Sequence, residues 1–182
     1  MRTVTYGAAS SLDGFIARKD HSVDWLQWSD DVAAITSQFW KSVDTVVMGR
    51  KTYEVAARGG TTSYPGMKTY VFSRTLKQLP DPAGQLCSDD AANVVRTLKA
   101  KDGKGICVMG GGELAHALFE ADLIDEVGVN FHPVLLGSGI PLFLGCRHQI
   151  DLELVECKPL KKGCVYVLYR VAPKHRGKKG RS

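Results

Sequence analysis

Residues 106–118, ICVMGGGELAHAL, carry the pattern that decides the fold. Ile106, Val108 and Met109 form an apolar run long enough for a buried strand, three glycines follow, and apolar residues then recur at helical spacing from Leu114. The stretch therefore predicts a strand, a glycine turn and a helix. Glycines let a ligand approach the backbone closely, and the free N–H groups at a helix start attract phosphate. A tight turn that needs glycine for a positive φ explains the same residues, because the full GxGxxG fingerprint is absent, so both interpretations stay open on this stretch alone.

Two further apolar strands end in the same way. Residues 44–48 (DTVVM) lead into the GRKT of 49–52, and residues 69–72 (TYVF) lead into the SRT of 73–75. Ligands of open α/β sheets bind outside the carboxyl ends of the strands, so the three ends converge if their strands are neighbours. Arginine suits bidentate contact with phosphate. Each charge taken singly is also explained as an exposed strand end, but together they predict a site for an extended, multiply phosphorylated ligand.

The remaining elements alternate between strand and helix patterns. The expected elements are strands at 3–9 and 124–131, a helix from the Ser29 cap through Asp30 and Asp31 to about Ser42, and a helix capped by Ser88. Residues 152–156 and 165–171 alternate on either side of a turn at 161–163, which predicts an antiparallel hairpin. The chain is thus expected to be α/β, with a mostly parallel central sheet flanked by helices and a C-terminal antiparallel hairpin.

Length and charge narrow the class of protein. With 182 residues and 44% hydrophobic content, we expect one domain over 1–172. The sequence shows neither a run of membrane-spanning length nor a signal peptide, so we expect a cytoplasmic protein without a membrane partner. Five of the 24 Lys and Arg residues lie in 173–182, so the other 19 balance the 19 Asp and Glu. We interpret 173–182 as a basic, disordered tail; a nucleic-acid-binding arm is the less favoured alternative.

Cysteine and histidine spacing gives no metal or disulfide signal. The five cysteines are an odd number, contain no CxxC pair and lie within or beside apolar stretches, so we expect buried free thiols. The five histidines show no HxxxH or HxH spacing. No metal site is expected.

Four segments, taken in order, resemble the dihydrofolate reductase-like superfamily. They are SLDGFIA (11–17), DTVVMGRKTYE (44–54), YVFSRT (70–75) and VMGGGELAHALFEADLIDEVGVNFHPVLLGSGIPLF (108–143). Within the superfamily, SLDG and LLGSGIPLF resemble the reductase domain of the riboflavin-pathway bifunctional deaminase-reductase and its stand-alone relatives, over residues 2–171. The HxE and PCxxC signature of the deaminase half is absent, so the resemblance implies a reductase alone.

The resemblance implies that NADPH lies along the strand ends. Its phosphates would contact Gly49, Arg50, Lys51 and Thr52, its 2'-phosphate Ser73 and Arg74, and its diphosphate Gly110, Gly111 and Gly112, with Glu113 and Leu114 opening the helix behind. The superfamily implies a cis peptide between Gly110 and Gly111. Ala9, Ile16 and Ala17 would flank the nicotinamide ring.

The substrate side is implied less directly. The nearest candidates are Phe15, Trp25, Asn130 and Pro133, and a loop over 10–28 is the expected lid. Asp13 is the candidate catalytic residue, as a group that binds or protonates substrate; an ordinary Asp-Gly turn is the other interpretation. Dihydrofolate reductase itself carries a carboxylate on the face of its first helix. Here Asp30 and Asp31 fall at the exposed first turn, so folate is not the expected substrate.

The sequence thus predicts an NADPH-dependent reductase that transfers a hydride to a small heterocyclic or aminopyrimidine/pterin-like substrate. The alternative is an NADPH-binding protein without turnover, and a nucleic-acid binder acting through the tail is the third and weakest hypothesis. The resemblance also implies a homodimer, for which the terminal hairpin is the candidate interface.

Overall fold

The structure is a computed structural model, and it describes residues 1–62, 64 and 66–173. The strands are β1 (Val4–Ser11), β2 (Phe15–Ala17), β3 (Val43–Gly49), β4 (Lys68–Phe72), β5 (Gly84–Cys87), β6 (Gly105–Met109), β7 (Glu126–His132), β8 (Ile140–Pro141), β9 (Leu152–Pro159) and β10 (Val165–Val171). The helices are α1 (Asp30–Ser42), α2 (Arg50–Arg58), α3 (Ala91–Ala100), α4 (Gly112–Glu120) and the short 3-10 helix η1 (Lys161–Gly163).

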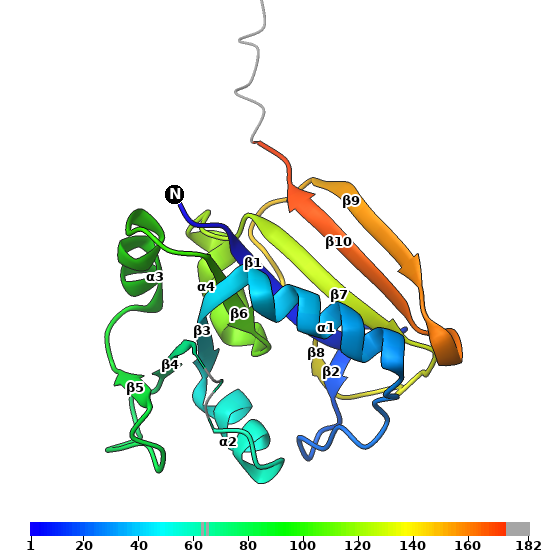
Figure 1. The fold of residues 1–182 in the computed structure, drawn as a ribbon, viewed down its shortest axis with the longest axis horizontal. Coiled ribbons are helices and arrows are strands. Elements are labelled where there is room, and N and C mark those ends of the chain that lie inside the picture. The colour runs from blue at the N-terminus through cyan, green and yellow to red at the C-terminus, as the bar shows by residue number, and fades with distance from the viewer. Residues whose placement is uncertain (63, 65, 174–182) are drawn as a thin grey trace, which may run out of the picture.

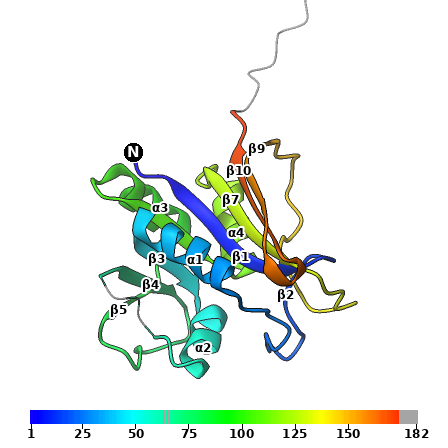
Figure 2. The same ribbon diagram turned by 45° about the vertical axis from the view of Figure 1, so that its right-hand side comes forward.

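Eight strands form one sheet in the order β5-β4-β3-β6-β1-β7-β10-β9, drawn in Figures 1 and 2. The pairs from β5 to β7 are all parallel, whereas β10 pairs antiparallel with both β7 and β9. A separate two-stranded sheet joins β2 to β8. The predicted fold class, including the terminal hairpin, is confirmed.

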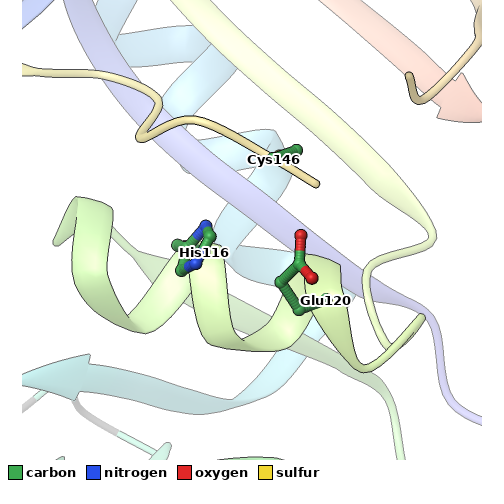
Figure 3. Close-up of side chains that lie close together, drawn as sticks. All are labelled: His116, Glu120 and Cys146. Atoms are coloured by element: carbon green, nitrogen blue, oxygen red, sulfur yellow. The ribbon is translucent and has the colours of Figure 1, made fainter. Parts of the chain in front are cut away.

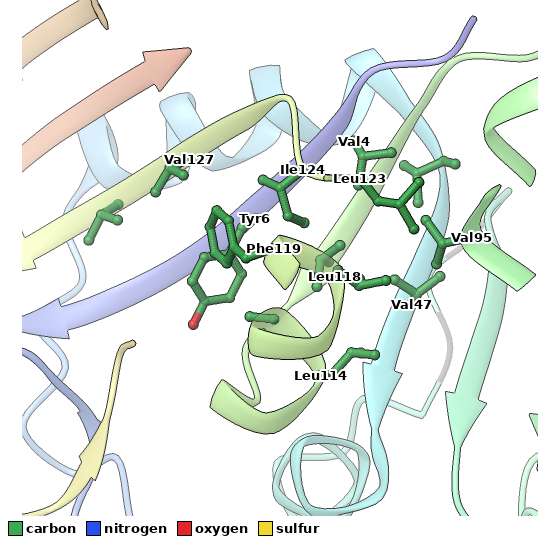
Figure 4. Packing of buried hydrophobic residues seen from close by; sticks show 14 of the residues in the cluster. Val4, Tyr6, Val47, Val95, Leu114, Leu118, Phe119, Leu123, Ile124 and Val127 are labelled. Carbon is green, nitrogen blue, oxygen red and sulfur yellow. The ribbon is translucent and has the colours of Figure 1, made fainter. Parts of the chain in front are cut away.

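Helices cover both faces of the sheet because its inner strands are apolar on both sides. On one face, α3 and α4 pack over residues such as Val4, Tyr6 and Val47 in the larger core cluster (Figure 4). On the other face, residues of α1 and α2 pack over a second cluster that includes Val46 and Met48. Neighbouring residues of β3 thus point to opposite cores, as the pleat of a strand requires.

Helix caps were predicted with mixed success. Ser29 caps α1 as expected, since its hydroxyl accepts a hydrogen bond from the Val32 N–H at 3.4 Å. The Ser88 cap of α3 was wrong: Asp90 is the cap, and its carboxylate accepts from Asn93 N–H at 2.9 Å. Strand β5 was not predicted from the sequence. It has four residues, one of them glycine, and pairs only with β4, so it shows no clear alternation.

The cysteines depart partly from the expectation of burial. Cys87, Cys107 and Cys164 are buried free thiols, but Cys146 and Cys157 are exposed. Cys157 lies on the edge strand β9, where almost every residue is exposed, and Cys146 lies in the connection between β8 and β9. Apolar neighbours in the sequence therefore did not mean burial in these segments.

The predicted basic tail begins at Pro173, and the rest of it, residues 174–182, lies outside the described residues. Among the described helices, none is long and apolar enough to cross a membrane.

Candidate functional site

The three strand ends singled out in the sequence lie side by side. Strands β4, β3 and β6 are consecutive in the sheet and parallel, so their carboxyl ends meet at one edge. The segments that follow these strands are the first turn of α2, the loop at 73–75 and the glycine turn at 110–112. The condition for the three ends to converge, that their strands are neighbours, is therefore met. We use the name crevice for this edge of the sheet, where the three segments come together.

The glycine turn touches the first turn of α2 across the crevice. A Cβ placed on Gly111 would lie 3.3 Å from the Thr52 Oγ1, and one on Gly110 would lie 3.5 Å from the Thr52 Cγ2. Behind them, a Cβ on Gly112 would lie 3.3 Å from the Pro141 carbonyl oxygen. The missing Cβ atoms let the turn lie this close to its neighbours, while Gly110 and Gly111 stay half-buried. The residues present therefore fit a diphosphate that approaches the N–H groups at the start of α4.

The cis peptide expected between Gly110 and Gly111 was wrong. Every peptide bond is trans in the part of the chain that the structure describes. The chain turns instead through two left-handed residues, with φ of 49° at Gly110 and 79° at Gly111. Glycine adopts this conformation without a steric penalty.

The polar side chains of the crevice are only partly engaged. Arg50 pairs with Glu54 one turn along α2, with Nη1 and Oε1 2.8 Å apart. The hydroxyl of Ser73 accepts from the N–H groups of Thr75 and Leu76, which shapes the loop after β4. Lys51 and Arg74 are exposed, and no described residue hydrogen-bonds to either side chain. Both cations are thus available to an anionic ligand.

Glu113 and Leu114 face away from one another at the start of α4. Glu113 is exposed, whereas Leu114 is 8% exposed and packs in the larger core cluster. Leu114 therefore positions the helix rather than contacting a ligand through its side chain.

An apolar cavity of about 240 Å³ lies between α1 and the sheet. It exists because the strands beneath α1 carry small residues, among them Gly7, Ala9 and Gly128. Val32, Ile35, Thr36, Phe39 and Trp40 of α1, with Trp28 and Met109, complete much of the wall. Met109 directly precedes the glycine turn, so the cavity adjoins the crevice. This cavity was not predicted from the sequence. The run of small residues in β1, Gly7 to Ala9, was the signal that could have indicated it.

The polar end of the cavity is a network around the buried His132. The Gln27 N–H donates to its Nδ1 at 3.1 Å, and the side-chain amide of Asn130 lies 3.1 Å from its Nε2. Because a backbone N–H can only donate, Nδ1 accepts and the ring proton is on Nε2. Asn130 must then turn its oxygen toward His132. Burial lowers the pKa of His132, which keeps the ring neutral.

Of the four expected substrate-side residues, only Asn130 lines the cavity. Trp25 is 8% exposed and packs edge-on against His132, with ring centroids 5.4 Å apart. Phe15 pairs with Pro141 across β2 and β8, and Pro133 lies at the surface beside Gly163. Of the three residues expected beside the nicotinamide, Ala9 lines the cavity, whereas Ile16 and Ala17 belong to β2.

Asp13 is held by the loop that faces it. Its carboxylate accepts from the Ser11 hydroxyl at 2.6 Å and from the N–H groups of Leu136 and Gly137 at 3.1 and 2.7 Å. These hydrogen bonds, that of Ser11 foremost, lower the pKa of Asp13. An ionised carboxylate with three donors is a poor proton donor, so the contacts favour the turn interpretation of Asp13 over a catalytic one. They also fasten part of the expected lid.

The mostly parallel sheet, the glycine turn before α4 and the crevice beside a cavity under α1 define a dihydrofolate reductase-like α/β protein. Dihydrofolate reductase from Enterococcus faecalis, complexed with NADP(H) and RAB-propyl, superposes with a TM-score of 0.68 at 18% identity, covering 94% of this chain and 97% of that one. A putative riboflavin biosynthesis protein from Shewanella sp. PV-4 superposes with a TM-score of 0.82 at 24% identity, covering 94% and 99%.

The chain belongs to the RibD C-terminal domain family, whose model matches residues 2–166. The family is of the reductase type. "Uncharacterized protein YwjB" of Bacillus subtilis (strain 168) is 37% identical over 155 residues, which cover 84% of this chain and 88% of that protein. The predicted family resemblance is confirmed.

Proposed function

We propose that this protein is an NADPH-dependent reductase that transfers a hydride to a small heterocyclic substrate of the aminopyrimidine or pterin type. The observation that carries the proposal is that three strand ends form one crevice, and that this crevice adjoins an apolar cavity against β1. Such a pairing offers a long site for an anionic ligand and a separate pocket for a flat ring. Membership of a reductase-type family supports the same assignment.

NADPH supplies the hydride when it is bound, so the task of the chain is to hold and align two partners. Lys51, Arg74 and the N–H groups after Gly111 would bind the phosphates, and the open cations favour the 2'-phosphorylated cofactor. Gly49, Arg50, Thr52 and Ser73 would support them, as the family resemblance implies. The nicotinamide would lie by Ala9, at the end of the cavity that Met109 shares with the crevice.

The cavity favours a neutral ring over folate. No Asp or Glu occurs among the described residues that line it. Asp31, the acidic residue at the start of α1, instead accepts from the Ser29 hydroxyl at 2.5 Å and from the Lys161 N–H at 2.6 Å. A cationic pterin would thus lack a counter-charge. The amide of Asn130, held by His132, is the polar group we propose for orienting the substrate.

The test is a calorimetric titration with NADPH and, separately, NADH. We expect Arg74→Ala to weaken NADPH binding by about tenfold or more, roughly 1.4 kcal/mol, and to leave NADH binding unchanged. Arg170→Ala is the matched control, because Arg170 is exposed on β10 and far from the crevice. In the strand register it lies opposite Glu126, at the start of β7, whereas the crevice is at the other end of the parallel strands. Failure of the wild-type protein to bind either nucleotide would overturn the cofactor assignment.

Turnover is tested separately, by following NADPH consumption with aminopyrimidines, pterins and riboflavin-pathway intermediates. Substrate-dependent consumption would support the reductase. Tight NADPH binding without consumption for any of these compounds would favour the alternative, a nucleotide-binding protein without turnover.

We further propose that two copies pair through the edge strand β9. Leu152, Leu154 and Val155 are 41%, 59% and 46% exposed on this strand, more apolar surface than a free edge ordinarily presents. A second copy of the chain would cover them.

A further inference from the structure

A second group of chemically active side chains lies on α4, beyond the glycine turn. His116 and Glu120 are four residues apart on this helix, so both lie on the same side of it. Cys146, from the connection between β8 and β9, lies over that side (Figure 3). One ligand atom from each of the three residues lies within 4.8 Å of the other two. Nitrogen, oxygen and sulfur donors therefore meet at one place.

Two of these side chains, His116 and Cys146, have few other partners among the described residues. His116 forms no hydrogen bond with any described residue, although its Nδ1 is buried. A buried ring nitrogen without a partner is costly, which is unusual for a side chain that only packs. The Cys146 thiol has one weak contact, with its Sγ 3.8 Å from the Leu144 carbonyl oxygen.

The connection that carries Cys146 is already attached to α4 through Glu120. Its carboxylate accepts from the Arg147 N–H at 2.9 Å and lies 3.3 Å from the Arg147 Nε. A carboxylate has lone pairs enough to keep the backbone hydrogen bond and also bind a cation. The guanidinium, 86% exposed, is then a competitor for Glu120 and can swing into solvent.

We propose that His116, Glu120 and Cys146 bind a divalent transition-metal ion of the zinc class, which fastens the connection between β8 and β9 to α4. Thiolate and imidazole select zinc over magnesium or calcium, and three protein ligands leave one tetrahedral position for water. The thiol releases its proton to solvent when its sulfur binds the metal. This site is independent of the proposed reductase function, because it uses no residue assigned to the crevice or the cavity.

The experiment is a Co²⁺ titration of the full chain, prepared without a histidine tag, stripped with a chelator and kept reduced. We expect one equivalent to bind with micromolar affinity or better, to give a thiolate-to-cobalt charge-transfer band with four-coordinate visible bands, and to be displaced by Zn²⁺. Cys146→Ser is expected to abolish the charge-transfer band, and His116→Gln to weaken binding by about tenfold or more. Cys157→Ser, which removes the other exposed thiol, is the matched control and should change nothing.

The Arg147→Ala variant distinguishes a metal-binding site from a group of side chains that only pack together. Because it removes the cation that competes for Glu120, we expect this variant to bind Co²⁺ several-fold more tightly than the wild type. Circular dichroism would verify that each variant is folded. Binding only at millimolar Co²⁺, a charge-transfer band that survives in Cys146→Ser, or weaker binding by folded Arg147→Ala would each overturn the proposal.

Discussion

Gly111→Ala separates the two interpretations of the glycine turn. Gly111 has a φ of 79°, and a left-handed conformation costs a residue with a Cβ about 1–2 kcal/mol. We expect the free energy of unfolding to fall by about that amount. The new methyl would also lie 3.3 Å from the Thr52 Oγ1, at the place where we propose that the diphosphate binds. We therefore expect NADPH binding to weaken by about tenfold or more, which corresponds to roughly 1.4 kcal/mol.

Gly60→Ala is the control for backbone strain. Gly60 has a φ of 81°, close to that of Gly111, and no described atom lies within 4 Å of the place that its new methyl would take. It follows the C-terminal end of α2, away from the crevice. The two variants should lose similar stability, but only Gly111→Ala should lose affinity for NADPH.

Urea unfolding and calorimetric titration with NADPH would measure the two quantities. If Gly111→Ala loses as much stability as Gly60→Ala but binds NADPH like the wild type, the reasoning is refuted. The glycines would then serve the turn alone, and the backbone would not hold a phosphate there.

Three further perturbations test other parts of the structure. The pKa of Asp13 is lowered from 3.8 on folding, so its contribution to stability is present above about pH 4 and is lost as the pH falls below that value. The Asp13→Asn variant should therefore lose less stability than the wild type over that acid range, and it should still consume NADPH. Loss of NADPH consumption with intact NADPH binding would restore the catalytic assignment of Asp13. The pKa of His132 is lowered from 6.5, so the unfolded state takes up the proton first and the free energy of unfolding should fall as the pH drops below about 6.5. The His132→Gln variant should not show this dependence on pH. Nitrogen NMR of the wild type should find the ring proton on Nε2. Leu154→Lys on β9 should convert a dimer to a monomer in sedimentation analysis, whereas an unchanged mass would place any interface elsewhere.

Local patterns in the sequence determined most of the elements. The strand, glycine turn and helix at 106–120, the Ser29 cap and the terminal hairpin are all fixed by residues close together in the chain, and each was confirmed. The weak points were also local. The four-residue strand β5 carries too little pattern to detect, and the cap of α3 depends on the exact residue at which the helix begins.

The chemistry of the site was decided by contacts between distant segments. Asp13 comes just after β1, a position where a catalytic acid could lie. Its carboxylate, however, accepts a hydrogen bond from the Leu136 N–H, 123 residues away in the chain. The Gln27 N–H that fixes the tautomer of His132 is 105 residues from it. No periodicity or spacing encodes such pairs, so their effect on pKa and polarity is visible only after folding.

The sequence by itself therefore determined the fold class, the three cationic or glycine-rich strand ends and the resemblance to a reductase family, because each rests on short-range periodicity or on motif order. Only the tertiary structure decided that β4, β3 and β6 are neighbours, that small residues of β1 and β7 leave a cavity beneath α1, and that Cys146 reaches α4. These features depend on how the sheet is ordered and on where its connections return, which side-chain packing across the whole chain sets.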